Sequence, residues 1–179
     1  MKKYLLLVSC LFLFGCSEEK VESKPSTEVV EEVVEDTKEI EVVKNDNDPW
    51  THIDVDVSVE YQDLNFHVNK VVVSNEIESD NGKVKAIGTK WKTTNNSKEE
   101  TYKSYLTLAT LITSDGEQVK VSESDLVAGE FAPGTVKEGN LTFILEKSDV
   151  ENLDWIKIVW NNTDSSSKLK ETEMTINLK

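Results

Sequence analysis

The residues of this chain that could catalyse a reaction are chiefly carboxylates. Asp54 and Asp56 alternate with valines, and Glu60 follows in the same phase. On a strand, Asp54 and Asp56 would share one face about 6.6–6.8 Å apart, a spacing that a glycoside hydrolase could use. A solvent-exposed strand face requires the same alternation, and water keeps carboxylate pKa values ordinary. We therefore expect no catalytic residue, and a glycan-acting enzyme with a carboxylate pair is the alternative.

Histidine and cysteine are too scarce to indicate a metal or cofactor site. The chain has two histidines, His52 and His67, and no cysteine after Cys16. Both histidines alternate with apolar residues, so surface histidines are the simpler interpretation. The acidic segments 46–48 and 78–82 lack the downstream bidentate glutamate of a calcium loop. Because nucleophile-elbow, phosphate-loop and dinucleotide motifs are also missing, we expect no metal and no cofactor.

The tryptophans of the chain fall in two different environments. Trp91 and Trp160 occupy the apolar phase of expected strands, which predicts that they fill the core. Trp155 shares the opposite phase with Lys157, so Trp155 and Lys157 form a possible interaction surface. A single exposed ring is fewer than a sugar-stacking platform would use, which favours packing in the core or an interface.

The charge of the chain argues against a nucleic-acid partner. Its 179 residues include 34 acidic and 20 basic ones, every basic residue is lysine, and the net charge is −14. Lysine lacks the planar fork with which arginine binds phosphate and guanine bidentately, and a negative field repels a polyanion. The same field favours a cationic ligand or a divalent ion, within about 10 Å at ordinary ionic strength.

The first sixteen residues have the composition of an export signal. Lys2 and Lys3 precede an apolar run over residues 5–14, whereas crossing a bilayer takes roughly 20 residues. Residues 13–16, Leu-Phe-Gly-Cys, resemble the lipobox of bacterial lipoproteins, with Phe14 in place of the usual small residue. The resemblance implies that residues 1–15 are a signal peptide and that Cys16 carries diacylglycerol, whose two chains hold a protein stably on a bilayer. We expect an anchored chain on the extracytoplasmic face of the bacterial cell membrane.

An acidic segment follows the expected anchor. Residues 17–48 include 12 acidic and 4 basic residues, with no glycine and no aromatic residue. Such a segment buries too little apolar surface to offset the entropy that folding costs. We expect residues 16–49 to be the lipidated Cys16 and a disordered tether. Valines at i,i+4 spacing within residues 28–35 leave open a short helix or a docking stripe for a partner.

From residue 50 onward, apolar residues alternate with polar ones. Residues 53–59 do so throughout, while residues 66–73 slip in phase, which indicates a β-bulge. Asn81-Gly82 and Asp115-Gly116 separate apolar runs and predict hairpins. Other strands are expected over 84–94, 102–112, 118–121, 141–145, 155–160 and 174–178.

The spacing of these strands predicts the fold class. One helical turn at most is expected, over residues 148–153, and no long helix. About eight short strands in residues 50–179 predict an all-β domain, an immunoglobulin-like antiparallel β-sandwich.

Three segments of this domain resemble a known family. Residues 84–96, residues 111–116 and the stretch from Pro133-Gly134 to Phe143 are similar to domain of unknown function 4352, found in extracellular bacterial lipoproteins and similar to a secreted mycobacterial immunoprotective antigen. The resemblance covers roughly residues 64–178. It implies an immunoglobulin-like sandwich outside the cell, and no catalytic or ligand-binding residue is carried over from it.

These observations together predict a non-catalytic binding or interaction module on a lipid anchor. Its expected partners are the membrane, through Cys16, and an envelope protein or a cationic ligand. A structural subunit of a membrane protein complex is a further alternative to the glycan-acting enzyme.

Overall fold

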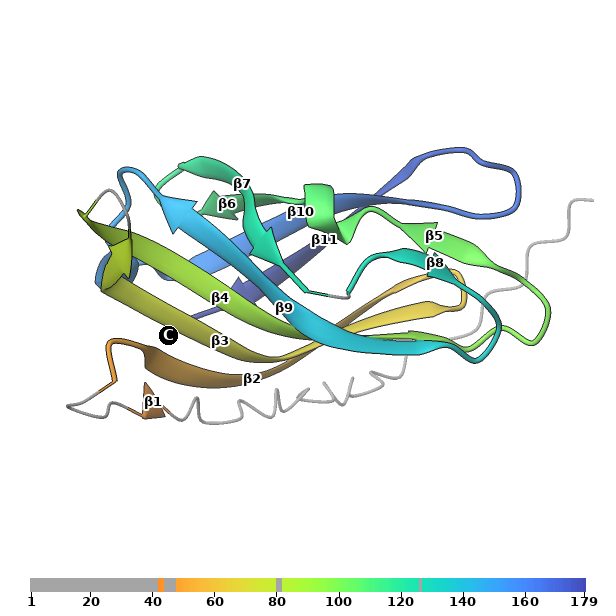
Figure 1. Ribbon diagram of the computed structural model, residues 1–179, viewed down its shortest axis with the longest axis horizontal. Helices are drawn as coiled ribbons and strands as arrows, with labels where there is room; N and C mark the ends of the chain where they lie inside the picture. The colour runs from red at the N-terminus through yellow and green to blue at the C-terminus, as the bar shows by residue number, and fades with distance from the viewer. Residues whose placement is uncertain (1–41, 44–47, 80–81, 126) are drawn as a thin grey trace, which may run out of the picture. The chain divides into compact units, whose positions relative to one another are not determined.

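The computed structural model describes residues 42–43, 48–79, 82–125 and 127–179 (Figure 1). The expected signal peptide, Cys16 and the tether up to residue 41 lie outside the described residues. Every strand pairing among the described residues is antiparallel, and no α-helix occurs among them. The all-β prediction is therefore confirmed for this part of the chain.

The first group of strands forms one continuous sheet. It contains β2, β3, β4, β9 and β7 in that order, with β1 on the outer edge of β2. The bounds are β1 Val42–Val43, β2 Thr51–Tyr61, β3 Leu64–Ser79, β4 Gly82–Asn95, β7 Gln118–Ser124 and β9 Val136–Leu145. Because these strands run side by side, residues far apart in sequence share one face.

The second group of strands is built around β10. This strand pairs with β11 on one side and with β6 and β5 on the other, and β5 also pairs with β8. The bounds are β5 Tyr102–Ser104, β6 Thr110–Thr113, β8 Gly129–Phe131, β10 Trp155–Thr163 and β11 Lys170–Asn177. Strand β7 pairs with both β6 and β9, so it joins the two groups.

The core contains aromatic rings from both groups of strands. The ring of Trp160 on β10 lies edge-to-face with Phe66 on β3 at 5.0 Å and with Trp91 on β4 at 5.5 Å between centroids. All three side chains are buried. The prediction that Trp91 and Trp160 fill the core is confirmed, and edge-to-face packing is the geometry that such rings prefer.

Local sequence signals predicted two hairpin turns, one β-bulge and one helical turn at their correct positions. Gly82 and Gly116 adopt φ values of 101° and 93° at the turns of the β3–β4 and β6–β7 hairpins, a backbone conformation that glycine reaches at little cost. The pairing of β3 with β4 shifts register between Val68 and Lys70, which confirms the bulge. The single turn expected over residues 148–153 is the 3₁₀ helix η2, Val150–Asn152.

The expected single strand over residues 102–112 is wrong. This stretch forms β5, the 3₁₀ turn η1 (Leu106–Leu108) and β6. Strand β5 pairs with one end of β10, at Asn162, and β6 pairs with the other end, from Ile156 to Val159. The 3₁₀ turn lies between the two pairings. Leu106 and Leu108 are two residues apart, as in a strand, and this spacing led to the prediction of one continuous strand.

The count of about eight strands in residues 50–179 is too low, because the described residues of that range contain ten and β1 precedes them. The additional strands β1, β5 and β8 have only two or three residues each. Strands this short carry almost no periodic signal. Strand β1, Val42–Val43, falls in the segment expected to be tether and pairs with Ile53 and His52 of β2.

Candidate functional site

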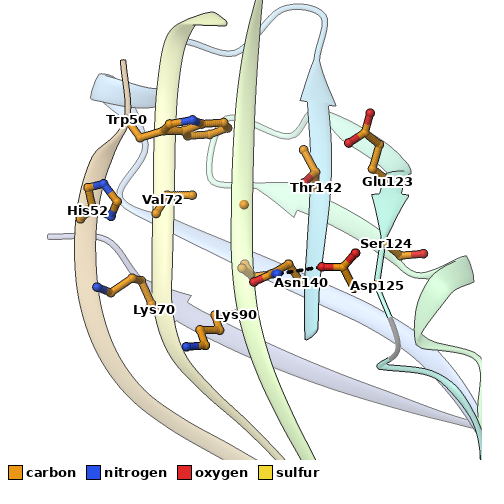
Figure 2. A pocket seen from close by; sticks show the side chains of 12 residues that line it. Trp50, His52, Lys70, Val72, Lys90, Glu123, Ser124, Asp125, Asn140 and Thr142 are labelled. Atoms are coloured by element: carbon orange, nitrogen blue, oxygen red, sulfur yellow. Dashed lines mark hydrogen bonds between the residues drawn. The ribbon is translucent and has the colours of Figure 1, made fainter. Parts of the chain in front are cut away.

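A groove of about 410 Å³ lies on the outward face of the first sheet (Figure 2). Its lining comes from the start of β2 and from β3, β4, β9 and β7. Alternation along the strands explains why these residues face outward. Val71 and Val73 of β3 are buried in the core, which leaves Lys70 and Val72 on the opposite face.

Gly88 and Val72 form the floor of the groove. Gly88 lies opposite Val72 on one side and opposite Thr142 on the other. A Cβ atom at Gly88 would come within 2.7 Å of Val72 Cγ2, closer than such contacts allow. The Val72 methyl therefore already covers the position that a side chain at residue 88 would take, and Val72 supplies an apolar floor.

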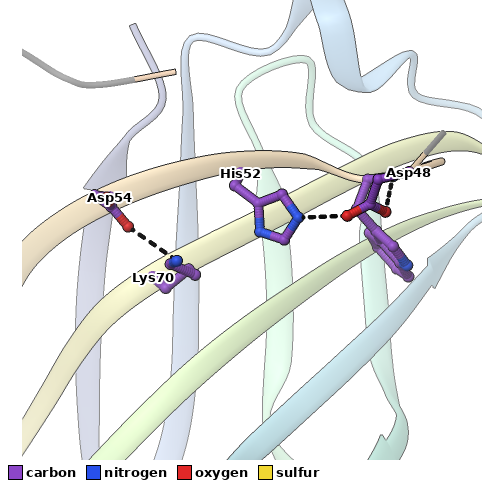
Figure 3. A network of polar contacts seen from close by, with 5 residues as sticks. Asp48, His52, Asp54 and Lys70 are labelled. Atoms are coloured by element: carbon purple, nitrogen blue, oxygen red, sulfur yellow. Dashed lines mark hydrogen bonds and ion pairs between the residues drawn. The ribbon is translucent and has the colours of Figure 1, made fainter. Parts of the chain in front are cut away.

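Trp50 lies at one end of the groove, held by a turn just before β2. The Asp48 carboxylate accepts hydrogen bonds from the Trp50 backbone N–H at 3.0 Å and pairs with His52 Nε2 at 2.9 Å (Figure 3). The bond with His52 and then the bond with the Trp50 N–H lower the pKa of Asp48. The half-buried indole extends from the start of β2 across β3 (Figure 2).

Two lysines lie directly opposite each other at the other end of the groove. Lys70 on β3 is the cross-strand partner of Lys90 on β4. Lys70 Nζ pairs with Asp54 Oδ1 at 3.3 Å (Figure 3), while Lys90 forms no ion pair with any of the residues described. Like charges opposite each other in a sheet repel, and within the described ranges no ion pair compensates the charge of Lys90.

Carboxylate and amide groups from β7 and β9 form the far wall. Asn140 Nδ2 donates to Asp125 Oδ2 at 2.8 Å, and the Asp125 backbone N–H donates to the Asn140 carbonyl at 3.0 Å. Glu123 lies opposite Thr142 in the register of the two strands. The wall thus offers the carboxylates of Glu123 and Asp125 as acceptors and the amide of Asn140, on the side of the groove away from Lys70.

This arrangement can bind a small molecule by stacking, hydrogen bonding and charge. A few convergent polar groups around an apolar floor are typical of ligand sites, and the volume lies in the usual range of roughly 300–1,000 Å³. No group of three or more histidine, cysteine, aspartate or glutamate side chains that could hold a metal ion occurs among the described residues. Nor do they contain a helix of the length and hydropathy that spanning a membrane requires.

The residues expected to form an interaction surface lie elsewhere. Trp155 and Lys157 occupy the outward face of β10 and do not line the groove. Lys157 Nζ pairs with Glu173 of β11 at 3.2 Å, and the Trp155 side chain is half-buried. Cys16, the expected lipidation site, lies outside the described residues.

The carboxylates weighed as a catalytic pair each bond to a different basic side chain. Asp54 pairs with Lys70, as described above, and Asp56 Oδ1 lies 3.0 Å from Nε2 of His67. Register between β2 and β3 shifts at this point, between Asp54 and Val57. The two carboxylates therefore serve separate contacts.

Sequence reasoning missed the residues that shape the groove, namely Trp50, Gly88 and Lys90. One signal was available, because a glycine inside a strand pattern indicates a close approach of another group. The other two residues carry no local signal. Their proximity depends on the pairing of three strands.

A second hollow, of about 500 Å³, lies near Tyr105. Leu108 and Leu169 line it and are 69% and 65% exposed. Lys103 Nζ lies 5.2 Å from the centre of the Tyr105 ring, and this cation–π contact already occupies the ring. Of the described residues, Lys103 is the one charged side chain that lines this hollow, whereas lysines and carboxylates both line the groove on the first sheet.

No protein-family model matches the chain, and no curated protein matches it. Among solved structures, a conserved hypothetical protein from Bacillus anthracis is similar at 13% identity and a TM-score of 0.44, over 70% of this chain and 98% of that one. A functionally unknown protein from Listeria monocytogenes EGD-e is similar at 18% identity and a TM-score of 0.47, over 68% of this chain and 81% of that one. The chain thus has structural similarity to bacterial proteins of unknown function, and no family is assigned to it.

Proposed function

We propose that this protein is a non-catalytic binding module held by lipid on the extracytoplasmic face of a bacterial membrane. The observation that carries the binding role is the groove, in which the Trp50 indole meets an apolar floor and Lys90, a lysine with no ion-pair partner in the described part of the chain. The anchoring role is supported by the sequence at Gly15-Cys16 and the apolar run before it. The acidic residues between Cys16 and Pro49 would then act as a spacer.

We further infer that the two groups of strands form an immunoglobulin-like sandwich. The contacts of Trp160 with Phe66 and Trp91 support this arrangement, because they join side chains from both groups in one core. The resemblance of residues 84–96 to domain of unknown function 4352 is consistent with it.

Substituting Cys16 tests the anchor. Cys16→Ala is expected to move the protein from the membrane fraction to the soluble extracytoplasmic fraction and to abolish incorporation of labelled fatty acid, because the acyl chains supply the membrane affinity. Cys10→Ala is the matched control, since Cys10 lies within the expected signal peptide. It should leave both readouts unchanged. A Cys16→Ala protein that still takes up label and sediments with membranes would refute the anchor.

A further inference from the structure

The backbone of the groove floor is already occupied by strand pairing. Strand β3 is bonded to β2 and β4, and β4 is bonded to β3 and β9, along the whole groove. An extended peptide gains affinity on a sheet mainly by pairing with a free strand edge. Recognition here depends on side chains instead, which favours a ligand that carries many polar groups of its own.

The end of the groove at Trp50 suits a ring with an apolar face. The indole is a broad, rigid surface, and the Asp48 carboxylate fixes the backbone that carries it. Beside it, Val72 covers Gly88 and gives the groove an apolar floor on which a ring can rest. The C–H face of a pyranose ring matches such a surface. Because one indole is fewer than a stacking platform would use, the hydroxyls at the edges of the sugar ring must also be held by hydrogen bonds to the walls of the groove.

The end at Lys90 suits an anion. Asp54 balances the charge of Lys70, whereas Lys90 has no acidic partner among the described residues. A carboxylate on the ligand would relieve the repulsion between the two lysines and form charge-assisted hydrogen bonds. Charges farther than about 10 Å are screened at physiological ionic strength, so Lys90 and the carboxylates that line the groove set the local field, and not the net charge of −14.

The wall at β7 and β9 suits hydroxyl groups. The Glu123 carboxylate has no ion-pair partner among the described residues, and Asp125 is positioned by Asn140. Carboxylates and amides accept and donate the paired hydrogen bonds that neighbouring sugar hydroxyls offer. This wall lies two strand spacings from Lys90, on the order of 10 Å, so one ligand can contact both.

We propose that the groove binds a short acidic saccharide, of about disaccharide size. One ring stacks on Trp50, a carboxylate of the uronic-acid type pairs with Lys90, and hydroxyls bond to Glu123 and Asp125. Trp50 precedes Asp54 by four residues, about 13 Å of strand, and Asp54 lies in the same cross-strand row as Lys90. The ligand must therefore reach about 13 Å along the strands from Trp50 to the row that contains Lys90, and one sugar ring is too short for that distance. The proposal deepens the binding role proposed above and replaces the cationic ligand expected from net charge.

Calorimetric titration of the full chain tests the proposal. The probes are a disaccharide containing glucuronic acid and the neutral disaccharide cellobiose. We expect the acidic disaccharide to bind at least about tenfold more tightly than cellobiose, the gain typical of a charge-assisted hydrogen bond.

Two pairs of variants assign the binding to the groove. Trp50→Ala should weaken binding of the acidic disaccharide at least about tenfold, and Lys90→Gln should remove most of its preference over cellobiose. The matched controls are Trp155→Ala, a half-buried tryptophan outside the groove, and Lys92→Gln, an exposed lysine on the same face of β4 that pairs with Glu138 at 3.5 Å. Both controls should bind as the parent chain does.

The possible failures separate this inference from the proposed function. Equal affinity for the two disaccharides, or loss of binding with Trp155→Ala instead of Trp50→Ala, would overturn the acidic-saccharide site and leave the module role standing. Absence of binding to both probes would overturn the site as well. Cleavage of the disaccharide, detected by chromatography of the products, would overturn the non-catalytic role while supporting the site.

Discussion

At the scale of single residues, Gly88 shows how one missing side chain shapes a surface. Replacing a strand glycine by alanine normally stabilises a protein by roughly 0.5–1 kcal/mol, because alanine loses less conformational freedom on folding. Here the new Cβ would lie 2.7 Å from Val72 Cγ2. Valine is stiff about χ1, so it cannot move aside cheaply.

We therefore expect Gly88→Ala to lower the free energy of unfolding by about 1–3 kcal/mol, the usual cost of overpacking. Urea denaturation measures the change. The double variant Gly88→Ala/Val72→Ala removes the clashing methyl, so it should lose less than the sum of the two single variants. Unchanged or increased stability of Gly88→Ala would show that the floor of the groove yields easily.

At the scale of elements, the stretch from β5 to β6 shows where period-two reasoning fails. Leu106 and Leu108 are two residues apart, so a strand would place both on one face. In the 3₁₀ turn η1, Leu106 is fully buried while Leu108 is 69% exposed. The difference follows from three residues per turn in place of two.

This pair of leucines gives a prediction with a built-in control. Leu106→Ala should lower the free energy of unfolding by about 2–5 kcal/mol, because it leaves a cavity in the core. Leu108→Ala should change it by no more than about 0.5 kcal/mol. Chemical denaturation of both variants measures the two values. Similar losses in both would contradict the turn and support the continuous strand instead.

At the scale of the whole molecule, two carboxylates connect the β6–β7 hairpin to the loop after β9. The Asp115 carboxylate accepts hydrogen bonds from the hydroxyls of Thr113 and Ser148. Glu117 accepts from the backbone N–H groups of Glu146 at 2.7 Å and Ser148 at 2.6 Å. The contacts join segments about thirty residues apart in sequence.

These hydrogen bonds shift the acidity of both groups in the same direction. Bonds from Thr113 and then from Ser148 lower the pKa of Asp115 below its usual value of 3.8. Burial acts to raise the pKa of Glu117, but bonds from Ser148, Glu146 and Lys147 together hold it below its usual value of 4.5. In the unfolded chain both groups bind protons more readily than in the folded protein.

The sign of the pH dependence follows from these shifts. The stabilisation is fully present above the unfolded pKa values of 3.8 and 4.5, and it is lost as pH falls through the lower folded values. We expect the urea midpoint to fall between about pH 5 and pH 3, although protonation also weakens repulsion within a chain of net charge −14. Glu117→Gln should flatten this fall. Glu171→Gln, at an exposed position of β11, should leave the fall unchanged. Equal effects of the two substitutions would refute the assignment of this pH dependence to Glu117.

Much of the fold follows from local sequence signals. The strict alternation in residues 53–59 marks β2, and the glycines at 82 and 116 mark two hairpins. The apolar phase around Trp91 and Trp160 identified the core correctly. These features depend on neighbours within a few residues, so pattern and turn chemistry are sufficient to find them. The lipid anchor at Cys16 and its membrane location remain predictions from sequence.

The groove depended on tertiary structure. Its central row, from His52 through Val72 and Gly88 to Thr142, crosses four strands that are distant in sequence. A slip of one residue in any pairing would turn that strand's side chains to the other face, and no local pattern sets the registers of all four strands together. The sequence alone determined an alternating, sheet-forming domain behind a signal-like start. Only the packed sheet decided which outward-facing residues meet, because register and bulges are set by the whole core at once.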